Sequence, residues 1–363
     1  MLDKKRFLVG TSLNPALHFG AELEKEFENL TGKKIDVPAI VPMEGNLGDY
    51  MVELPKGDLL AFEAGAKAKL RMEGSSLNVA AALNLFGHQV KLIGAIGEDQ
   101  YAAALVRYCR EMGIDFDPLN RGSETPFTLA ARCKAGTTLF CYKPDFRVED
   151  PAFLAKYIRF DQPDVLCFTS VRPSELELVR RTFELAPEGT IKAFTPAIRV
   201  LNNPDHRAEL LAIARLANVI AFNSRELRHL IRSEDDGGDP IDHLREVVAI
   251  IRADGRHQSK LMVIETVGHK GAAAVFAAHG AKDQFFQQEA CSVRVVDRTG
   301  AGDTFLAAYL GGLAWGWSIE KSLKLAAHAA AENIRGVGGH ALVDIINQGY
   351  TSVNSWLRHN RLL

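Results

Sequence analysis

Short runs of mostly apolar residues recur along the chain, separated by longer segments with helical spacing. The runs lie at 7–9, 90–93, 165–168, 219–222 and 261–264. A strand that is apolar on both faces is typical of a parallel sheet covered by helices on both sides. The intervening helical segments include 78–86, 174–186 and 240–253. The pattern therefore predicts an α/β fold with a mostly parallel central sheet and helices on both faces.

The segment at 36–73 has a different pattern. It contains short β-prone pieces, such as the one at 50–54, broken by Pro and Gly. We expect a small β-sheet here, set apart from a core formed by 1–35 and 74–363. Such a sheet would leave exposed edges and an apolar face, which a homodimer partner would cover.

Composition and charge exclude several classes of protein. Hydrophobic residues make up 47% of the chain, charged residues 24%, and the formal net charge is −2. This balance gives no basic footprint for nucleic acid and no polybasic patch for a membrane surface. No window approaches 18 uninterrupted apolar residues, and the charged N-terminus leads into no signal-peptide pattern. We therefore expect a cytoplasmic protein.

The five cysteines indicate the same compartment. They stand at positions 109, 133, 141, 167 and 291, and no two have the C-x-x-C spacing. An odd number of scattered cysteines argues against a disulfide framework or a zinc site. They are interpreted as buried thiols in a reducing compartment.

A glycine-rich turn at 300–302 carries the strongest chemical signal. We expect a strand to end near Val296 and a helix to begin near Thr304, so the turn would expose backbone N–H groups at the positive end of a helix. That arrangement binds an oxyanion. Asp303 follows directly. A carboxylate at an anion site would repel a phosphate, so its presence there needs a reason, and the simplest is that it removes a proton from an attacking hydroxyl. Alternatively, Asp303 is a first-turn residue favoured by the helix dipole.

Residues 297–303 read D-R-T-G-A-G-D, which resembles the D-T-x-G-A-G-D signature of the ribokinase-like family, also called the PfkB carbohydrate kinases. Four further stretches resemble family elements in the right order between about residues 74 and 340. They are 74–80 with 94–99, the N-x-x-E element at 223–226, the T-x-G-x-x-G loop at 266–271, and 327–331 with Gly338 and Gly339. Five elements in order are far more specific than one.

The resemblance implies a Rossmann-like α/β core with a small β-sheet lid over a sugar pocket. It implies a small-molecule substrate, ATP and Mg²⁺, and often an activating monovalent cation such as K⁺. The implied reaction moves the γ-phosphoryl group of ATP to a hydroxyl of a sugar or sugar-like molecule. Asp303 would be the general base, beside Gly300, Ala301 and Gly302. A nucleoside kinase of the same family, or a catalytically silent paralogue that binds a nucleotide or sugar, stays open.

The resemblance also assigns roles on the nucleotide side. The nucleotide-binding residues would be Asn223, Thr266, Gly268, Gly271 and His328. Glu226 would be an outer-shell partner of hydrated Mg²⁺. Asp297 and Thr299 would help to hold the monovalent cation, with carbonyl groups of 335–340. Read without the family, Asn223 and Glu226 form a capping box, and His328 is a packed helix histidine.

The acceptor side departs from the family pattern. Asn78 and Gly74 match substrate-binding positions, although Glu73 replaces the first glycine of the usual pair. The aspartate expected after the first strand has two candidate counterparts here, which are His18 and Asp49. Asn14 belongs to an Asn-Pro-x-Leu pattern that is similar to the nucleoside-kinase branch. Arg199 is the only residue of a D-x-N-x-R element that is kept here. Arg298 either faces the phosphates or points outward.

Overall fold

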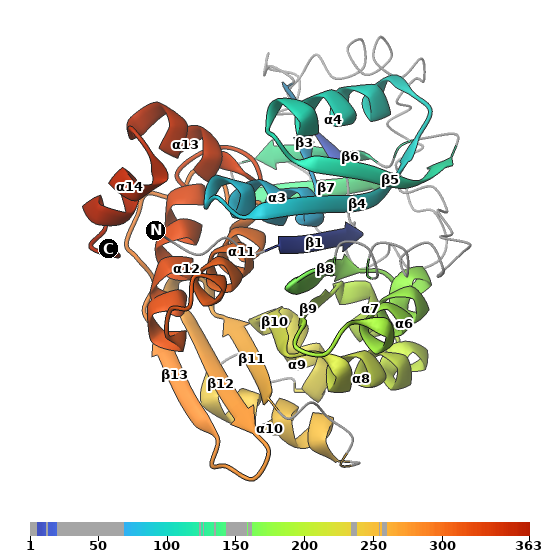
Figure 1. Ribbon diagram of the computed structural model, residues 1–363, viewed down its shortest axis with the longest axis vertical. Helices are drawn as coiled ribbons and strands as arrows, with labels where there is room; N and C mark the ends of the chain where they lie inside the picture. The colour runs from blue at the N-terminus through green and yellow to red at the C-terminus, as the bar shows by residue number, and fades with distance from the viewer. Residues whose placement is uncertain are drawn as a thin grey trace.

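A long twisted sheet forms the centre of the protein (Figure 1). The computed structural model describes residues 6–11, 14–19, 69–122, 125, 127–133, 136–142, 158, 162–233, 238–253, 255 and 260–363. Within this part of the chain, nine strands form one sheet in the order β13-β12-β11-β10-β9-β8-β1-β4-β5. Their bounds are β1 Arg6–Thr11, β4 Gln89–Gly97, β5 Asp115–Gly122, β8 Val165–Val171, β9 Ile191–Pro196, β10 Val219–Asn223, β11 Lys260–Thr266, β12 Ala272–Ala278 and β13 Gln284–Gln288.

The strand order contains a switch point. The chain starts at β1, moves outward through β4 and β5, and then continues from β8, on the other side of β1, through β9 to β11. All pairs from β11 to β5 are parallel, and only β12 and β13 are added as antiparallel edge strands. In such sheets, ligands bind outside the carboxyl ends of the strands where the order reverses. Here that place lies between β1 and β8.

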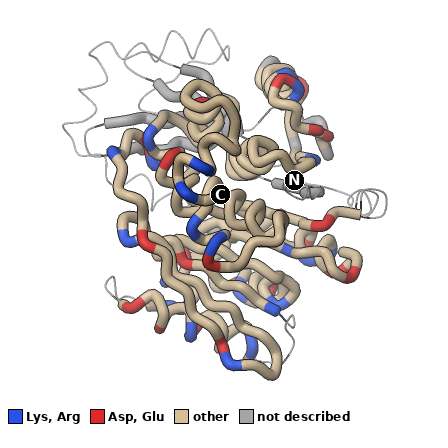
Figure 2. Tube along the Cα trace, turned by 60° about the vertical axis from the view of Figure 1, so that its left-hand side comes forward, with Lys and Arg blue, Asp and Glu red and all other residues tan. Residues whose placement is uncertain are grey.

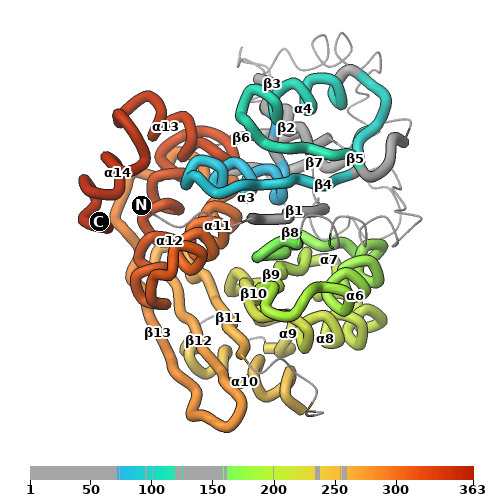
Figure 3. The backbone as a smooth tube through the Cα atoms, in the orientation of Figure 1, coloured from blue at the N-terminus to red at the C-terminus, as the bar shows by residue number. Residues whose placement is uncertain are grey.

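Helices cover both faces of the sheet, as the sequence predicts (Figure 3). One face packs against α3 Ser75–Leu85, α4 Gln100–Glu111, α11 Ala301–Ala314, α12 Ile319–Asn333, α13 Ala341–Gly349 and α14 Val353–His359. The other packs against α6 Leu176–Leu185, α7 Ile198–Asn202, α8 Arg207–Leu216, α9 Ser224–Ile231 and α10 Pro240–Arg252. The predicted α/β class with a mostly parallel sheet is confirmed.

Strand β8 shows why its sequence is apolar without interruption. Val165 and Cys167 belong to the core on the α11 side, whereas Leu166 and Phe168 belong to the core on the α6 side. All four side chains are at most 3% exposed. Since successive residues of a strand point to opposite faces, a strand buried on both faces needs apolar residues at every position.

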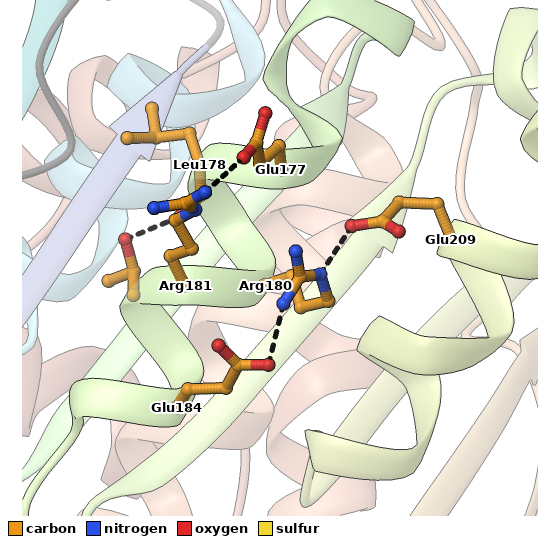
Figure 4. Close-up of polar contacts among 7 residues, drawn as sticks. Glu177, Leu178, Arg180, Arg181, Glu184 and Glu209 are labelled. Carbon is orange, nitrogen blue, oxygen red and sulfur yellow. Dashed lines mark hydrogen bonds and ion pairs between the residues drawn. The ribbon is translucent and has the colours of Figure 1, made fainter.

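The charged residues lie mainly outside these two cores. Arg180 on α6 donates hydrogen bonds to Glu184 on the same helix and to Glu209 on α8, with donor–acceptor distances of 2.7 and 2.6 Å (Figure 4). Such surface ion pairs contribute little to stability, so burial of the apolar faces stabilises the helix layers. Positive and negative residues are interspersed over the described part of the chain (Figure 2). Among the described residues, no helix is long and apolar enough to cross a membrane.

A second, smaller sheet has the strand order β3-β2-β6-β7. Its strands are β2 Asn14–Phe19, β3 Lys69–Glu73, β6 Phe127–Cys133 and β7 Gly136–Tyr142. Only β3 falls within the segment from which the sequence predicted a lid, and residues 36–68 lie outside the described residues. The contributions of β2, β6 and β7 were not anticipated. The domain division at residues 36–73 stays a prediction.

Phe183 provides a test of the α6 layer. Its side chain is fully buried and packs edge-to-face on Phe168, with ring centroids 5.7 Å apart. We expect Phe183→Ala to lower the free energy of unfolding by about 3–5 kcal/mol, because the cavity left behind cannot fully collapse. Leu185→Ala on the same helix, where the side chain is 52% exposed, should change it by less than about 0.5 kcal/mol. Urea denaturation followed by circular dichroism measures both, and equal losses would contradict this packing.

Candidate active site

The glycine-rich turn lies at the start of α11, where the sequence predicted an anion site. Gly300 is the N-cap residue with φ 71°, the helix begins at Ala301, and Asp303 stands in its first turn. Two expectations need correction. The helix starts three residues before Thr304, and no strand precedes the turn, since residues 289–300 have no regular structure. Val295 and Val296 are 47% and 44% exposed, so their apolar character reflects no buried strand.

Close backbone contact explains two of the glycines. A side chain on Gly300 would overlap the carbonyl oxygen of Gly339, and the positive φ of Gly300 would strain any other residue. A side chain on Gly339 would in turn overlap the amide of Asn78. The turn, the 335–340 segment and the start of α3 are therefore packed against one another without room for a methyl group.

Asp297 ties the turn to the 335–340 segment. Its Oδ1 accepts hydrogen bonds from the Thr299 backbone N–H and hydroxyl at 3.1 and 2.8 Å, and its Oδ2 accepts from the Gly338 N–H at 2.8 Å. The Asn333 side chain adds a bond from Nδ2 to the Thr299 carbonyl at 3.0 Å and accepts from the Leu342 N–H at 2.9 Å. The structure thus brings together the two residues assigned to a monovalent cation, and shows that they also fix the turn.

Asp303 is held by Asn78. The Nδ2 group of Asn78 on α3 donates to Oδ2 of Asp303 at 2.8 Å, and Asn78 is only 3% exposed. The charge of Asp303 reaches two other elements. With burial as the larger cause, it raises the pKa of Cys167 on β8 and the pKa of Glu226 on α9. Asp303 therefore faces the carboxyl ends of the central strands, where the strand order predicts a ligand.

Glu226 and Asn223 form the capping box that the sequence allowed. The Asn223 side chain accepts from the Glu226 N–H, and the Glu226 carboxylate accepts from the Asn223 N–H, both at 2.9 Å. Burial nevertheless raises the pKa of Glu226 from 4.5 to about 7, and no cation is among the groups that shift it. Two carboxylates, Glu226 and Asp303, thus repel each other here. This donor set suits Mg²⁺, whose charge would relieve the repulsion.

A cavity of about 470 Å³ opens beside the turn. Three of the predicted nucleotide-binding residues line it, namely Thr266, Gly268 and Gly271, and so do Ala301 and Gly302 of the turn. Its size suits a cofactor-sized ligand. The remaining wall is formed by His269, Ala290, Cys291, Ser292, Val293, Val295, Arg298, Phe305, Ala327, Ala330, Ala331 and Ile334.

Two predicted nucleotide residues are not part of this wall. His328 is half-buried on α12, hydrogen-bonded to Asn360, whereas Ala327 and Ala331 at helical spacing line the cavity. Asn223 pairs with Thr266 in the register of β10 and β11, so it lies at the adjacent strand end. Arg298, whose direction the sequence left open, does line the cavity. Sequence reasoning missed the irregular segment 290–295 as part of the wall, because it predicted a strand ending near Val296.

Glycines also shape the loop after β11. Gly268 and Gly271 have φ values of 56° and 97°, and a side chain on Gly271 would overlap the backbone of Gln288. The Val267 N–H donates to the Gly271 carbonyl at 2.7 Å, which closes the turn between the antiparallel strands β11 and β12. The T-x-G-x-x-G motif is therefore the turn of a β-hairpin. The same turn brings backbone to the cavity wall.

Serine and threonine side chains gather at the switch point beside β8. Ser75 and Ser170 pair through their hydroxyls at 2.8 Å, and Ser76 and Thr169 pair at 3.0 Å. The Ser170 N–H donates to the Thr195 hydroxyl at 2.9 Å, and Ser170 has a positive φ of 48°. Backbone strain of this kind at the end of a central strand is typical of functional sites. Ser75 and Ser76 belong to the 74–80 motif, whereas sequence reasoning missed Thr169 and Ser170 because no motif marks them.

The other predicted acceptor residues are less closely defined. Gly74 precedes α3 with φ 130° and accepts a hydrogen bond from the Asn78 N–H at 2.8 Å. Asn14 and His18 lie on β2 of the smaller sheet, where Asn14 pairs with Glu73. Arg199 belongs to α7, which follows β9. Asp49 lies outside the described residues.

Gly300 and Gly302 form a matched pair for testing the turn. We expect Gly300→Ala to lower the midpoint of thermal unfolding by about 3 °C or more, because the methyl group meets backbone and φ is positive. At Gly302, a Cβ would meet nothing within 4 Å. Gly302→Ala should therefore leave the midpoint unchanged or raise it. The same loss in both variants would contradict the proposed backbone contact.

Glu226 should make stability depend on pH. Between about pH 4.5 and 7 the folded protein keeps a proton on Glu226 that the unfolded chain has released. Stability is therefore lost as the pH rises through this window. In metal-free buffer, we expect Glu226→Gln to retain the capping hydrogen bond and to unfold at a higher temperature than the parent protein at pH 8, with no such gain at pH 4.5. An equal difference at both pH values, measured by thermal melts, would exclude this titration.

Comparison with known proteins identifies the family. The sequence model for "pfkB family carbohydrate kinase" matches residues 63–345, well over half of the chain. Similar sequences include "Probable fructokinase-6, chloroplastic" of Arabidopsis thaliana, 24% identical over 284 residues, which are 74% of this chain and 69% of the relative. They also include a 5-dehydro-2-deoxygluconokinase of Clostridium beijerinckii, 25% identical over 278 residues, which are 72% of this chain and 78% of the relative.

A similar fold occurs in the crystal structure of adenosine kinase from Sinorhizobium meliloti. The TM-score is 0.66 at 18% sequence identity, and the match covers 95% of this chain and 99% of that protein. The five motifs, the ribokinase-like fold and the family match agree with one another. The chain belongs to the pfkB family of carbohydrate kinases and is a phosphotransferase that acts on a hydroxyl acceptor.

Proposed function

We propose that the protein transfers the γ-phosphoryl group of ATP to a hydroxyl of a sugar or sugar-like small molecule, with Asp303 as the general base. The observation that carries this proposal is the position of Asp303 in the first turn of α11, next to Ala301 and Gly302, which line the cavity. The similarity to a fructokinase and a 5-dehydro-2-deoxygluconokinase supports a sugar acceptor.

The reaction follows from the chemistry of the turn. Asp303 Oδ2 accepts a hydrogen bond from Asn78, and Oδ1 takes the proton of the acceptor hydroxyl. The hydroxyl oxygen forms a bond to the γ-phosphorus as the bond to the β,γ-bridging oxygen breaks, and ADP leaves with that electron pair. Backbone N–H groups at the start of α11 and the helix dipole stabilise the negative charge on the phosphoryl oxygens.

The cavity is the proposed ATP site. The apolar surface for adenine would be formed by Ala327, Ala330 and Ala331. These alanines would take the role that the sequence assigned to His328. Gly268 and Gly271 let the backbone approach the ribose and phosphates. Arg298, at the wall next to the turn, adds positive charge on the phosphate side.

Mg²⁺ would lie on the Glu226 side of Asp303. It would supply positive charge to the phosphates, and Glu226 would hold water molecules of its outer shell. The raised pKa of Glu226, to about 7, supports a cation there, because burial without a compensating charge disfavours the carboxylate. Asp297 and Thr299 stay the proposed monovalent-cation residues. Their hydrogen bonds to the turn would link that cation to the anion site.

Replacing Asp303 tests the assignment of the base. We expect Asp303→Asn to lower kcat by about 10²–10⁴-fold, because the amide cannot take the proton, while the affinity for ATP changes little. Coupled assays of ADP release over a panel of sugars and nucleosides would measure turnover, and calorimetry with a non-hydrolysable ATP analogue would measure affinity. Asp205→Asn, at an exposed position remote in sequence from Asp303, is the matched control and should behave like the parent protein.

Each outcome of this panel has a definite meaning. A near-parental kcat for Asp303→Asn would show that another group is the base. Turnover confined to nucleosides would replace the sugar acceptor by a nucleoside. ATP binding without turnover of any hydroxyl compound by the parent protein would favour the silent paralogue over the kinase.

A further inference from the structure

A row of hydrogen bonds leads from α4 to the proposed base. The Tyr108 hydroxyl lies 2.6 Å from Nε2 of His340, and Nδ1 of His340 lies 3.4 Å from Oδ1 of Asn78. Nδ2 of Asn78 lies 2.8 Å from Oδ2 of Asp303. We propose that Tyr108 and His340 are positioning residues, which orient the Asn78 amide and through it Asp303. This inference rests on the proposed role of Asp303 as the base.

The donor and the acceptor of each hydrogen bond in the row follow from the Asp303 carboxylate at its end. An ionised carboxylate only accepts hydrogen bonds, so Asn78 presents its NH₂ group to Asp303 and its carbonyl oxygen to His340. That oxygen requires a donor, so Nδ1 of a neutral His340 carries the proton. Nε2 then accepts from the Tyr108 hydroxyl. Each of the four groups has one role, set by the charge on Asp303.

Packing holds the amide in place. Asn78 and His340 are 3% and 6% exposed, and the Gly339 backbone lies so close to the Asn78 amide that a side chain at position 339 would overlap it. The Tyr108 and His340 rings lie 5.4 Å apart at an angle of 36°. Because water has little access, the amide depends on these protein groups for its hydrogen bonds.

His340 becomes important when Asp303 changes its protonation state. After Oδ1 of Asp303 takes the proton, rotation of the carboxyl group would bring its O–H toward Asn78, and a rotated Asn78 amide would then offer its carbonyl oxygen instead of its NH₂ group. The proton would then stay in the hydrogen bond between Asp303 and Asn78, and the Asp303 carboxyl group would no longer be aligned with the acceptor. The Nδ1–H of His340 holds the carbonyl oxygen and so keeps the amide in one orientation through the catalytic cycle. Tyr108 in turn fixes the tautomer of His340.

Tyr108 belongs to none of the motifs that mark the family in this sequence, and the resemblance gives the 335–340 segment a role only through its carbonyl groups, not through the His340 side chain. Tyr108 and His340 are 232 positions apart, and His340 and Asn78 are 262 apart. They join α4 and the residue before α13 to the two helices that carry Asn78 and Asp303. These contacts reach the base without involving residues of the cavity wall.

Four variants test the row by steady-state kinetics with the best acceptor from the panel. We expect Tyr108→Phe to lower kcat several-fold and His340→Leu to lower it about tenfold, with KM for ATP unchanged, since misplacement of a catalytic group acts on the chemical step. His340→Asn should recover most of this loss, because its amide nitrogen can replace Nδ1 as the donor to Asn78. In the His340→Asn protein, Tyr108→Phe should then have no further effect.

Tyr309→Phe is the matched control. Tyr309 is fully buried on α11, and its hydroxyl has no hydrogen-bond partner among the described residues. We expect this variant to keep the parental kcat. Thermal melts of all variants identify losses that come from unfolding. If His340→Leu does not fold, the conservative variants Tyr108→Phe and His340→Asn carry the test.

The outcomes separate this inference from the proposed function. Parental kcat in Tyr108→Phe and His340→Leu, together with an inactive Asp303→Asn, would overturn the positioning role and leave the base intact. Losses that multiply in the Tyr108→Phe, His340→Asn double variant, or that appear in KM for ATP, would show a merely structural role and also overturn it. An active Asp303→Asn would instead overturn the base, and the row with it.

Discussion

The site depends on the close backbone contact between Gly300 and Gly339. It brings the glycine-rich turn against the 335–340 segment, and Gly339 in turn lies against the Asn78 amide. Asp297 reinforces the contact through its bonds to Thr299 and Gly338. Because these groups are held without a ligand, the proposed reaction would need little rearrangement of the N–H donors and Asp303 when a phosphoryl group enters. Such preorganisation is the main source of electrostatic catalysis.

The electrostatics of the site show a folded state that is not optimised for stability. Asp303 and Glu226 face the same region, and Glu226 has a pKa of about 7 because burial disfavours its charge. The strained backbone of Ser170 lies at the end of the strand that also carries Cys167, whose pKa is raised by burial and by Asp303. In the proposed reaction, a cation near Glu226 would lower the cost of its buried charge.

Sequence reasoning succeeded where one local rule decides the structure. Continuous apolar runs such as that of β8 indicate strands buried on both faces, and Gly300 of the turn is required by its positive φ and by close approach to Gly339. It failed where distant segments decide. Val295 and Val296 resemble a strand but line or adjoin a cavity, the smaller sheet takes β6 and β7 from beyond residue 120, and the contact between Tyr108 and His340 spans most of the chain. The side of α12 that faces the cavity was also missed, because three alanines line it, whereas His328 is hydrogen-bonded to Asn360.

A crystal structure with a non-hydrolysable ATP analogue, Mg²⁺ and the preferred acceptor would test the role of Asp303. We expect the reacting hydroxyl oxygen to lie about 2.6–3.2 Å from Oδ1 of Asp303 and in line with the γ-phosphorus, with the Asn78 amide still bonded to Oδ2. An acceptor hydroxyl that contacts a different carboxylate, or a γ-phosphoryl group bound away from the start of α11, would contradict it.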